Sequence, residues 1–145
     1  MGDEGSGAVL GKHFLSDVLK GLAPKEVMAD FFEKFRISPN EVMESVYNRP
    51  FPNRFLSTIS YFLADYTSDD YVYELIITNL RNFFTRNVCQ YDYKSYPIRF
   101  VGSLAYSYAP ILREVAGDFG IELDVIEETP MNGLIDFHSL NIEEP

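Results

Sequence analysis

The sequence predicts an α/β protein in which a helical block is followed by a parallel βαβ unit and a terminal helix. Two observations predict this order. Over most of residues 1–97, apolar side chains recur every three or four positions, which is the spacing of amphipathic helices. Further on, two runs of β-branched and aromatic residues, 98–103 and 121–128, flank a helical stretch closed by Gly120. A strand, a helix and a strand within about thirty residues form a βαβ unit with parallel strands and a right-handed crossover.

Five helices are expected in the helical block, because each apolar stripe there follows a recognisable start signal. Proline suits the first turn of a helix, and Ser or Asp caps its first free N–H groups. Ser38 and Glu41 enclose a capping box with proline at the first helical position. Gly21 closes the first helix. The expected starts are Ser6, Pro24, Ser38, Pro52 and the stretch Ser68-Asp69-Asp70.

Three further features lie outside these five helices. Residues 89–97, CQYDYKSYP, break the helical period and are expected to form a loop. Pro110 falls inside the helix of the βαβ unit, so we expect either a late helix start or a kink there. Thr129 and Pro130 cap the final helix, whose apolar residues include Leu134.

The composition argues against several classes of protein. The 145 residues carry a formal net charge of −10, which repels phosphate backbones and anionic lipid, so neither nucleic acid nor a membrane surface is expected as a partner. The one cysteine, Cys89, is typical of a reducing compartment. The sequence shows neither a signal peptide nor the roughly 20 apolar residues of a membrane-spanning helix. We therefore expect a cytoplasmic protein with one domain, or half of a two-domain protein.

The first twelve residues, MGDEGSGAVLGK, allow two interpretations. They do not form a Walker A phosphate loop, because Ser6 stands where that motif needs glycine and His13 where it needs Ser or Thr. One interpretation is a flexible Gly/Ser linker. The other is a loop that holds Asp3 and Glu4 in fixed geometry at a helix N-terminus, since the motif continues directly into an amphipathic helix.

Several motifs, spaced in the right order, resemble a known family. GDEGSGAVLG before a long helix resembles the glycine-flanked acidic motif in the middle of N-acetylglucosamine kinases and related BadF/BadG/BcrA/BcrD-type ATPases. These proteins are part of the sugar kinase, actin and chaperone ATPase superfamily. IRFVGSLAYSYAPILREVA is similar to that family's adenosine motif, a strand ending in Val-Gly-Ser before a helix. NRF with DDY downstream, and ETPMNGLIDFHS, are further matches, so the resemblance covers residues 2–139.

The resemblance implies that the chain is the C-terminal half of a longer kinase, with the helix-rich half of an actin-like (ribonuclease H-like) ATPase fold. Residues 1–145 would form the nucleotide-side domain of a two-domain kinase, with 1–97 mainly helical and 98–139 βαβα. The general base would lie in the other half. No catalytic residue is therefore expected in this chain, and the chain alone is expected to be inactive.

The implied activity is transfer of the γ-phosphoryl group of ATP to N-acetylglucosamine or a related amino sugar, with ATP and Mg²⁺ as cofactors. The resemblance also allows a homodimer. It implies that Asp3 binds the sugar and that Gly102, Ser103 and Leu56 contact the nucleotide, although the family has a small residue at position 56. From the residues alone, Asp3 could instead cap a helix and Gly102 could be an ordinary turn glycine.

Two other functions stay open. An ATPase that activates an iron–sulfur dehydratase belongs to the same superfamily, but it needs cysteine ligands and this chain offers only Cys89. A non-enzymatic helical interaction module would dock through Tyr91, Tyr93 and Tyr96 of the 89–97 loop. Such tyrosine clusters more often belong to a core or a subunit contact.

Overall fold

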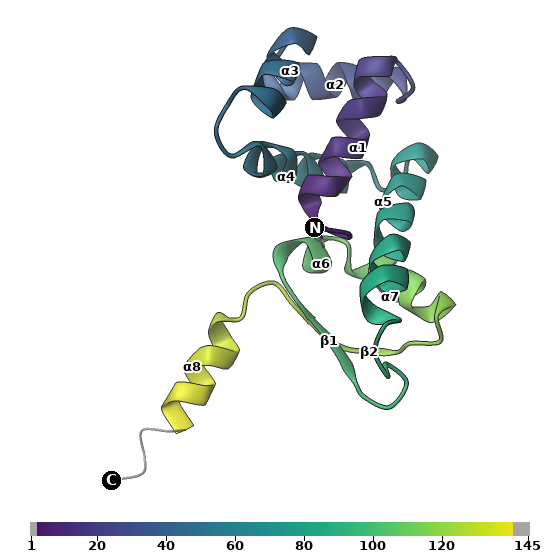
Figure 1. Ribbon diagram of the computed structural model, residues 1–145, viewed down its shortest axis with the longest axis vertical. Helices are drawn as coiled ribbons and strands as arrows, with labels where there is room; N and C mark the ends of the chain where they lie inside the picture. Colours follow the sequence, from purple (N-terminus) through teal and green to yellow (C-terminus); the bar gives the residue numbers. More distant parts are fainter. Residues whose placement is uncertain (1–2, 141–145) are drawn as a thin grey trace. The chain divides into compact units, whose positions relative to one another are not determined.

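The structure is a computed structural model that describes residues 3–140 of the chain, which divides into two compact units. Unit 1 is Met1–Asp92 and unit 2 is Tyr93–Pro145. Figure 1 traces the helices of unit 1 and the α/β elements of unit 2. Unit 1 contains α1 (Gly7–Lys20), α2 (Lys25–Phe35), α3 (Pro39–Tyr47), α4 (Pro52–Leu63), η1 (Ala64–Tyr66), α5 (Asp70–Phe83) and η2 (Phe84–Val88). Unit 2 contains β1 (Ile98–Val101), α6 (Ser103–Ser107), α7 (Ala109–Asp118), β2 (Leu123–Glu127) and α8 (Met131–Leu140).

The five expected helices of unit 1 begin at or next to their start signals. Ser6 caps α1, because its Oγ accepts a hydrogen bond from the N–H of the third helical residue (3.2 Å). The capping box of α3 is complete: the Ser38 N–H donates to Glu41 Oε2 (2.8 Å), and the Glu41 N–H donates to Ser38 Oγ (3.4 Å). Within the predicted capping stretch Ser68-Asp69-Asp70, Asp69 is the cap of α5, since its carboxylate accepts the hydrogen bond from the helix.

The core of unit 1 is built around aromatic side chains from α1, α2 and α4. Phe14, Phe31 and Phe62 are at most 2% exposed, and their ring centroids lie 5.5 to 6.0 Å apart in edge-on or tilted contacts. α1 and α4 approach closely at Gly11, where an added Cβ atom would lie 2.1 Å from the Leu56 carbonyl oxygen. Only glycine fits at this crossing.

The C-terminal end of α5 widens into the π-helical turn η2. The Cys89 N–H donates to the Phe84 carbonyl (2.8 Å), which is the five-residue spacing of a π-helix. The apolar pattern predicted α5 but not this turn. Between η2 and β1 the chain forms turns and bends, as expected for a loop.

Unit 2 contains the predicted βαβ unit. β1 and β2 pair in parallel, with Ile98 opposite Leu123 and Val101 opposite Glu127. The connecting helix is broken at Tyr108 into α6 and α7, and Pro110 lies in the first turn of α7. The sequence predicted a late start or a kink, and the structure instead has a break between two helices, because proline cannot donate the hydrogen bond that a continuous helix needs.

The α/β class, the helical block, the parallel βαβ unit and the terminal helix are thus confirmed. The actin-like architecture stays a prediction, as does the role of residues 1–145 as the nucleotide-side domain of a kinase. Within residues 3–140, every helix is too short or too polar to cross a membrane.

Candidate functional site

The loop before α1 has a defined backbone conformation. The Ser6 N–H donates to the Asp3 carbonyl oxygen (3.0 Å), which closes a turn. Within this turn Gly5 has a positive φ of 76°, a conformation that L side chains rarely adopt. The turn then leads into α1 through the Ser6 cap.

α5 and η2 hold this loop in place. A Cβ atom on Gly5 would lie 2.7 Å from Phe83 Cβ, so the glycine backbone packs directly on that side chain. The Nδ2 atom of Asn79, which is only 5% exposed, donates to the Ser6 carbonyl (3.4 Å). The carboxylate of Glu4 lies 4.0 Å from the Arg86 guanidinium. A flexible linker would not have these contacts, so the loop is part of the fold.

Asp3 is the residue that this loop presents to solvent. Its side chain is exposed, and no hydrogen bond or ion pair of its carboxylate occurs among residues 3–140. Ser6, not Asp3, caps α1, so the alternative role of Asp3 as a helix cap is wrong. The carboxylate is available to accept hydrogen bonds from a ligand, and each would be charge-assisted.

Gly102 lies between β1 and α6. Its φ of 141° and ψ of 150° belong to a region that is essentially restricted to glycine. The Gly102 N–H donates to the Glu127 carbonyl (2.8 Å), which extends the parallel ladder by one residue. No atom lies within 4 Å of the position of an added Cβ, so one side of this backbone is open. Ser103, half-buried, is the first residue of α6.

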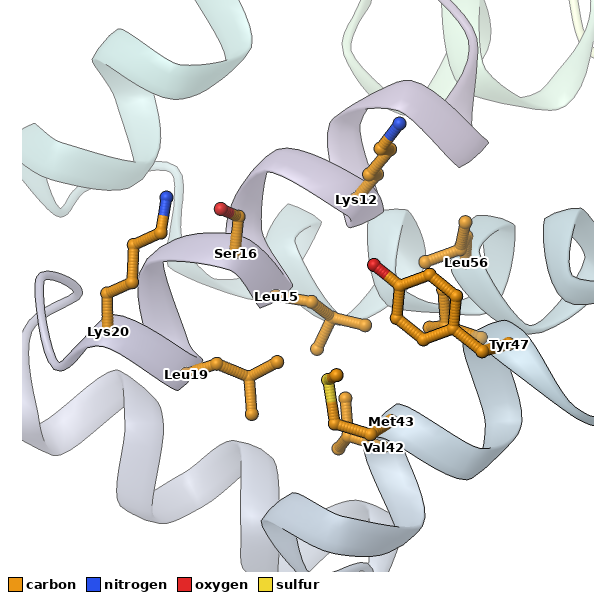
Figure 2. Close-up of a pocket in the computed structure, with 10 residues that line it drawn as sticks. Lys12, Leu15, Ser16, Leu19, Lys20, Val42, Met43, Tyr47 and Leu56 are labelled. Atoms are coloured by element: carbon orange, nitrogen blue, oxygen red, sulfur yellow. The ribbon is translucent and has the colours of Figure 1, made fainter.

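Leu56 lines a groove of unit 1 between α1, α3 and α4. The groove has a volume of about 260 Å³, and Leu56 on its wall is 5% exposed. Figure 2 shows Leu15 and Met43 pointing toward one another, while the amines of Lys12 and Lys20 point away. The lining residues are Lys12, Leu15, Ser16, Leu19, Lys20, Val42, Met43, Val46, Tyr47 and Leu56. A nucleotide contact of Leu56 stays a prediction.

The predicted site residues therefore fall in both units. Asp3 and Leu56 belong to unit 1, and Gly102 and Ser103 belong to unit 2. Sequence analysis missed Asn79. This residue of α5 supports the loop of residues 3–6 before α1, which we call the glycine loop. A signal was present, because Asn79 is a polar residue on an otherwise apolar helix face next to Leu80.

Other candidate groups do not form a site among the described residues. Residues 3–140 hold no cluster of three His, Cys, Asp or Glu side chains that could bind a metal ion. Cys89 is half-buried. Tyr91 and Tyr96 are 77% and 72% exposed, so these two tyrosines of the loop are not core residues.

Comparison with known proteins supports one resemblance. No protein-family model and no curated protein matches the chain. The chain does match the crystal structure of a Porphyromonas gingivalis protein that is provisionally named an N-acetylglucosamine kinase. The two share 39% sequence identity with a TM-score of 0.92, over 96% of this chain and 49% of the solved chain. The chain thus spans about half the length of the protein it matches, and the resemblance seen in the sequence is confirmed.

Proposed function

We propose that this chain is the nucleotide-side half of a kinase that transfers the γ-phosphoryl group of ATP to N-acetylglucosamine or a related amino sugar. The observation that carries the proposal is the match to the Porphyromonas gingivalis protein, which extends over nearly the whole of this chain at 39% identity. The ordered glycine loop adds support, because it presents a carboxylate that has no hydrogen bond or ion pair among residues 3–140.

Asp3 is the proposed sugar ligand. Two hydroxyl groups on adjacent carbons of a pyranose can both donate to one carboxylate, and such charge-assisted bonds are about twice as strong as neutral ones. The contacts of Gly5 with Phe83 and of Ser6 with Asn79 keep the loop in one conformation. The backbone that carries Asp3 is therefore held in position before the sugar arrives, which lowers the entropy lost on binding.

Gly102 and Ser103 are the proposed nucleotide contacts. The open side of Gly102 fits this role, because a flat ring can approach the backbone where another residue would carry Cβ. Bound Mg²⁺ would neutralise charge on the phosphates, and it is usually held by those phosphates with only one or two carboxylates. The contribution of this chain is to position the sugar and the adenosine.

The test uses the joined protein, which we define as this chain linked to the half of the Porphyromonas gingivalis protein that lies outside the match. Asp3→Asn should raise the KM for N-acetylglucosamine at least tenfold, because an amide accepts hydroxyl hydrogen bonds less strongly than a carboxylate. The KM for ATP should change less than twofold. ADP release with varied sugar and varied ATP measures both constants.

Asp92→Asn is the matched control, because Asp92 is an exposed aspartate in the loop after η2. It should leave both constants unchanged. Equal effects of the two substitutions would contradict a sugar-binding role for Asp3.

Neither alternative function gains support from a specific observation. Cys89 is a half-buried thiol, and no metal-ligand cluster surrounds it within residues 3–140. A disordered glycine loop would have favoured the interaction-module hypothesis, whereas this loop is packed against α5. A homodimer and a cytoplasmic location remain predictions from the sequence.

A further inference from the structure

The terminal helix α8 is exposed along its length in the part of the chain that the structure describes. Every side chain from Met131 to Ser139 is exposed (α8 is yellow in Figure 1). This is unusual for its large apolar residues, which are 47% to 62% exposed: Met131, Leu134, Ile135 and Phe137. The other helices of ten or more residues each bury at least two side chains.

Three of the four exposed apolar residues of α8 share one face. Met131, Leu134 and Ile135 are spaced by three and four residues, so they form a continuous stripe on the helix, which we call the α8 stripe. Asn132 and Asp136 lie on the opposite side. A polar and an apolar face on one helix indicate that the apolar face packs against another surface.

The helix also needs such a surface in order to form. Isolated helices shorter than about 12 to 15 residues are marginal in water even when rich in alanine. α8 has ten residues, and Gly133 in its interior costs roughly 1 kcal/mol relative to alanine. Packing of the stripe is the remaining source of stability.

The match to the solved kinase indicates what that surface is. It covers 96% of the 145 residues, so about six residues lie outside it and at least part of α8 has a counterpart in the longer chain. We propose that the α8 stripe docks on the half of the full-length kinase that this chain lacks. This inference rests on the proposed function only in taking the chain as one half of a larger protein.

A second copy of the chain fits the stripe less well. A stable interface buries roughly 800 Å² per partner. α8 is only about 15 Å long and would cover a fraction of that area. A half joined through the same polypeptide has an effective concentration in the millimolar range, so a small apolar surface is enough to hold it.

Hydrogen–deuterium exchange of the α8 amides tests the proposal. In the 145-residue chain these amides should exchange rapidly, and in the joined protein at least tenfold more slowly. Leu134→Asp should restore rapid exchange in the joined protein. Asn132→Asp adds the same charge on the opposite face and should leave the protection intact. Because Leu134 is exposed in the isolated chain, neither substitution should change the melting temperature of that chain.

Three results would overturn the proposal. The amides of α8 could exchange equally fast in both proteins, or Leu134→Asp could leave the protection unchanged. Protection in the isolated chain that rises with protein concentration would instead show that a second copy covers the stripe. The readout needs neither ATP nor sugar. Protected amides in a joined protein without kinase activity would therefore count against the proposed function and not against docking.

Discussion

At the scale of single residues, Gly11 shows how one position determines the packing of two helices. An added Cβ would lie 2.1 Å from the Leu56 carbonyl oxygen and 3.3 Å from Ile59 Cβ. Backbone cannot move aside as the end of a flexible side chain can. The sequence placed Gly11 inside an amphipathic helix but could not show that a second helix crosses there, because the contact joins residues 45 positions apart.

We expect Gly11→Ala to lower the free energy of unfolding by about 3 kcal/mol, at the upper end of the usual cost of overpacking. The effect opposes the gain of up to about 1 kcal/mol that alanine normally gives inside a helix. Gly117→Ala in α7 is the control, because nothing lies within 4 Å of its added Cβ. It should be neutral or stabilising. Thermal unfolding followed by circular dichroism measures the stability of both variants. Equal stabilities would contradict the close approach of α1 and α4 at Gly11.

Tyr71 connects α5 to α1 and makes stability depend on alkaline pH. Burial, and then the hydrogen bond that its hydroxyl donates to Asp17 Oδ2 (2.8 Å), raise the pKa of Tyr71 above its ordinary value of 10. A hydrogen bond to Asp30 likewise raises the pKa of Tyr66 to about 12. A raised pKa stabilises the fold below pH 10, where the phenol is protonated in both states, and this contribution is lost as pH rises further.

The free energy of unfolding should therefore fall as the pH rises from 10 towards 12. Tyr71→Phe should cost about 1 kcal/mol at neutral pH by removing the hydrogen bond, and should make the alkaline loss shallower. Tyr47→Phe is the control, since that side chain is 74% exposed. Urea unfolding between pH 8 and pH 11, a range chosen to bracket the ordinary tyrosine pKa, provides the measurement. If the free energy of unfolding of Tyr71→Phe fell with pH as steeply as that of the unchanged protein, Tyr71 would not be the cause of the alkaline loss.

At the scale of elements, helix starts could be predicted from the sequence because caps are local. The bonds of Ser6 and Ser38 join residues three positions apart, so their pattern is visible in a short window. The support of the glycine loop could not be predicted in this way. Asn79 and the Ser6 carbonyl that it contacts are separated by 73 positions. The π-helical turn η2 also has no local signal in the sequence.

The cap of α5 allows a sharp test within one element. Asp69→Ala should lower the free energy of unfolding by about 1 kcal/mol, because the first turn loses an acceptor for its N–H groups. Ser68→Ala, one position earlier, should change it by less than about 0.5 kcal/mol, as expected for a substitution at an exposed site. Urea unfolding distinguishes the two. A larger loss from Ser68→Ala would place the cap one residue earlier.

At the scale of the whole molecule, periodicity predicted the order of a helical block and a βαβ unit, but the function came from spaced motifs. Asp3 and Gly102 lie in different units, and no local pattern connects them. Only resemblance to a longer kinase related the two positions, and the solved structure supports that resemblance over 96% of the chain.

The central claim is that this chain is half of an amino-sugar kinase, and ATP-dependent phosphorylation of N-acetylglucosamine tests it most directly. The assay compares the 145-residue chain with the joined protein and measures sugar phosphate and ADP together. We predict no product from the chain alone, and equal amounts of sugar phosphate and ADP from the joined protein. A joined protein with protected α8 amides that forms no sugar phosphate would contradict the claim, as would turnover by the isolated chain.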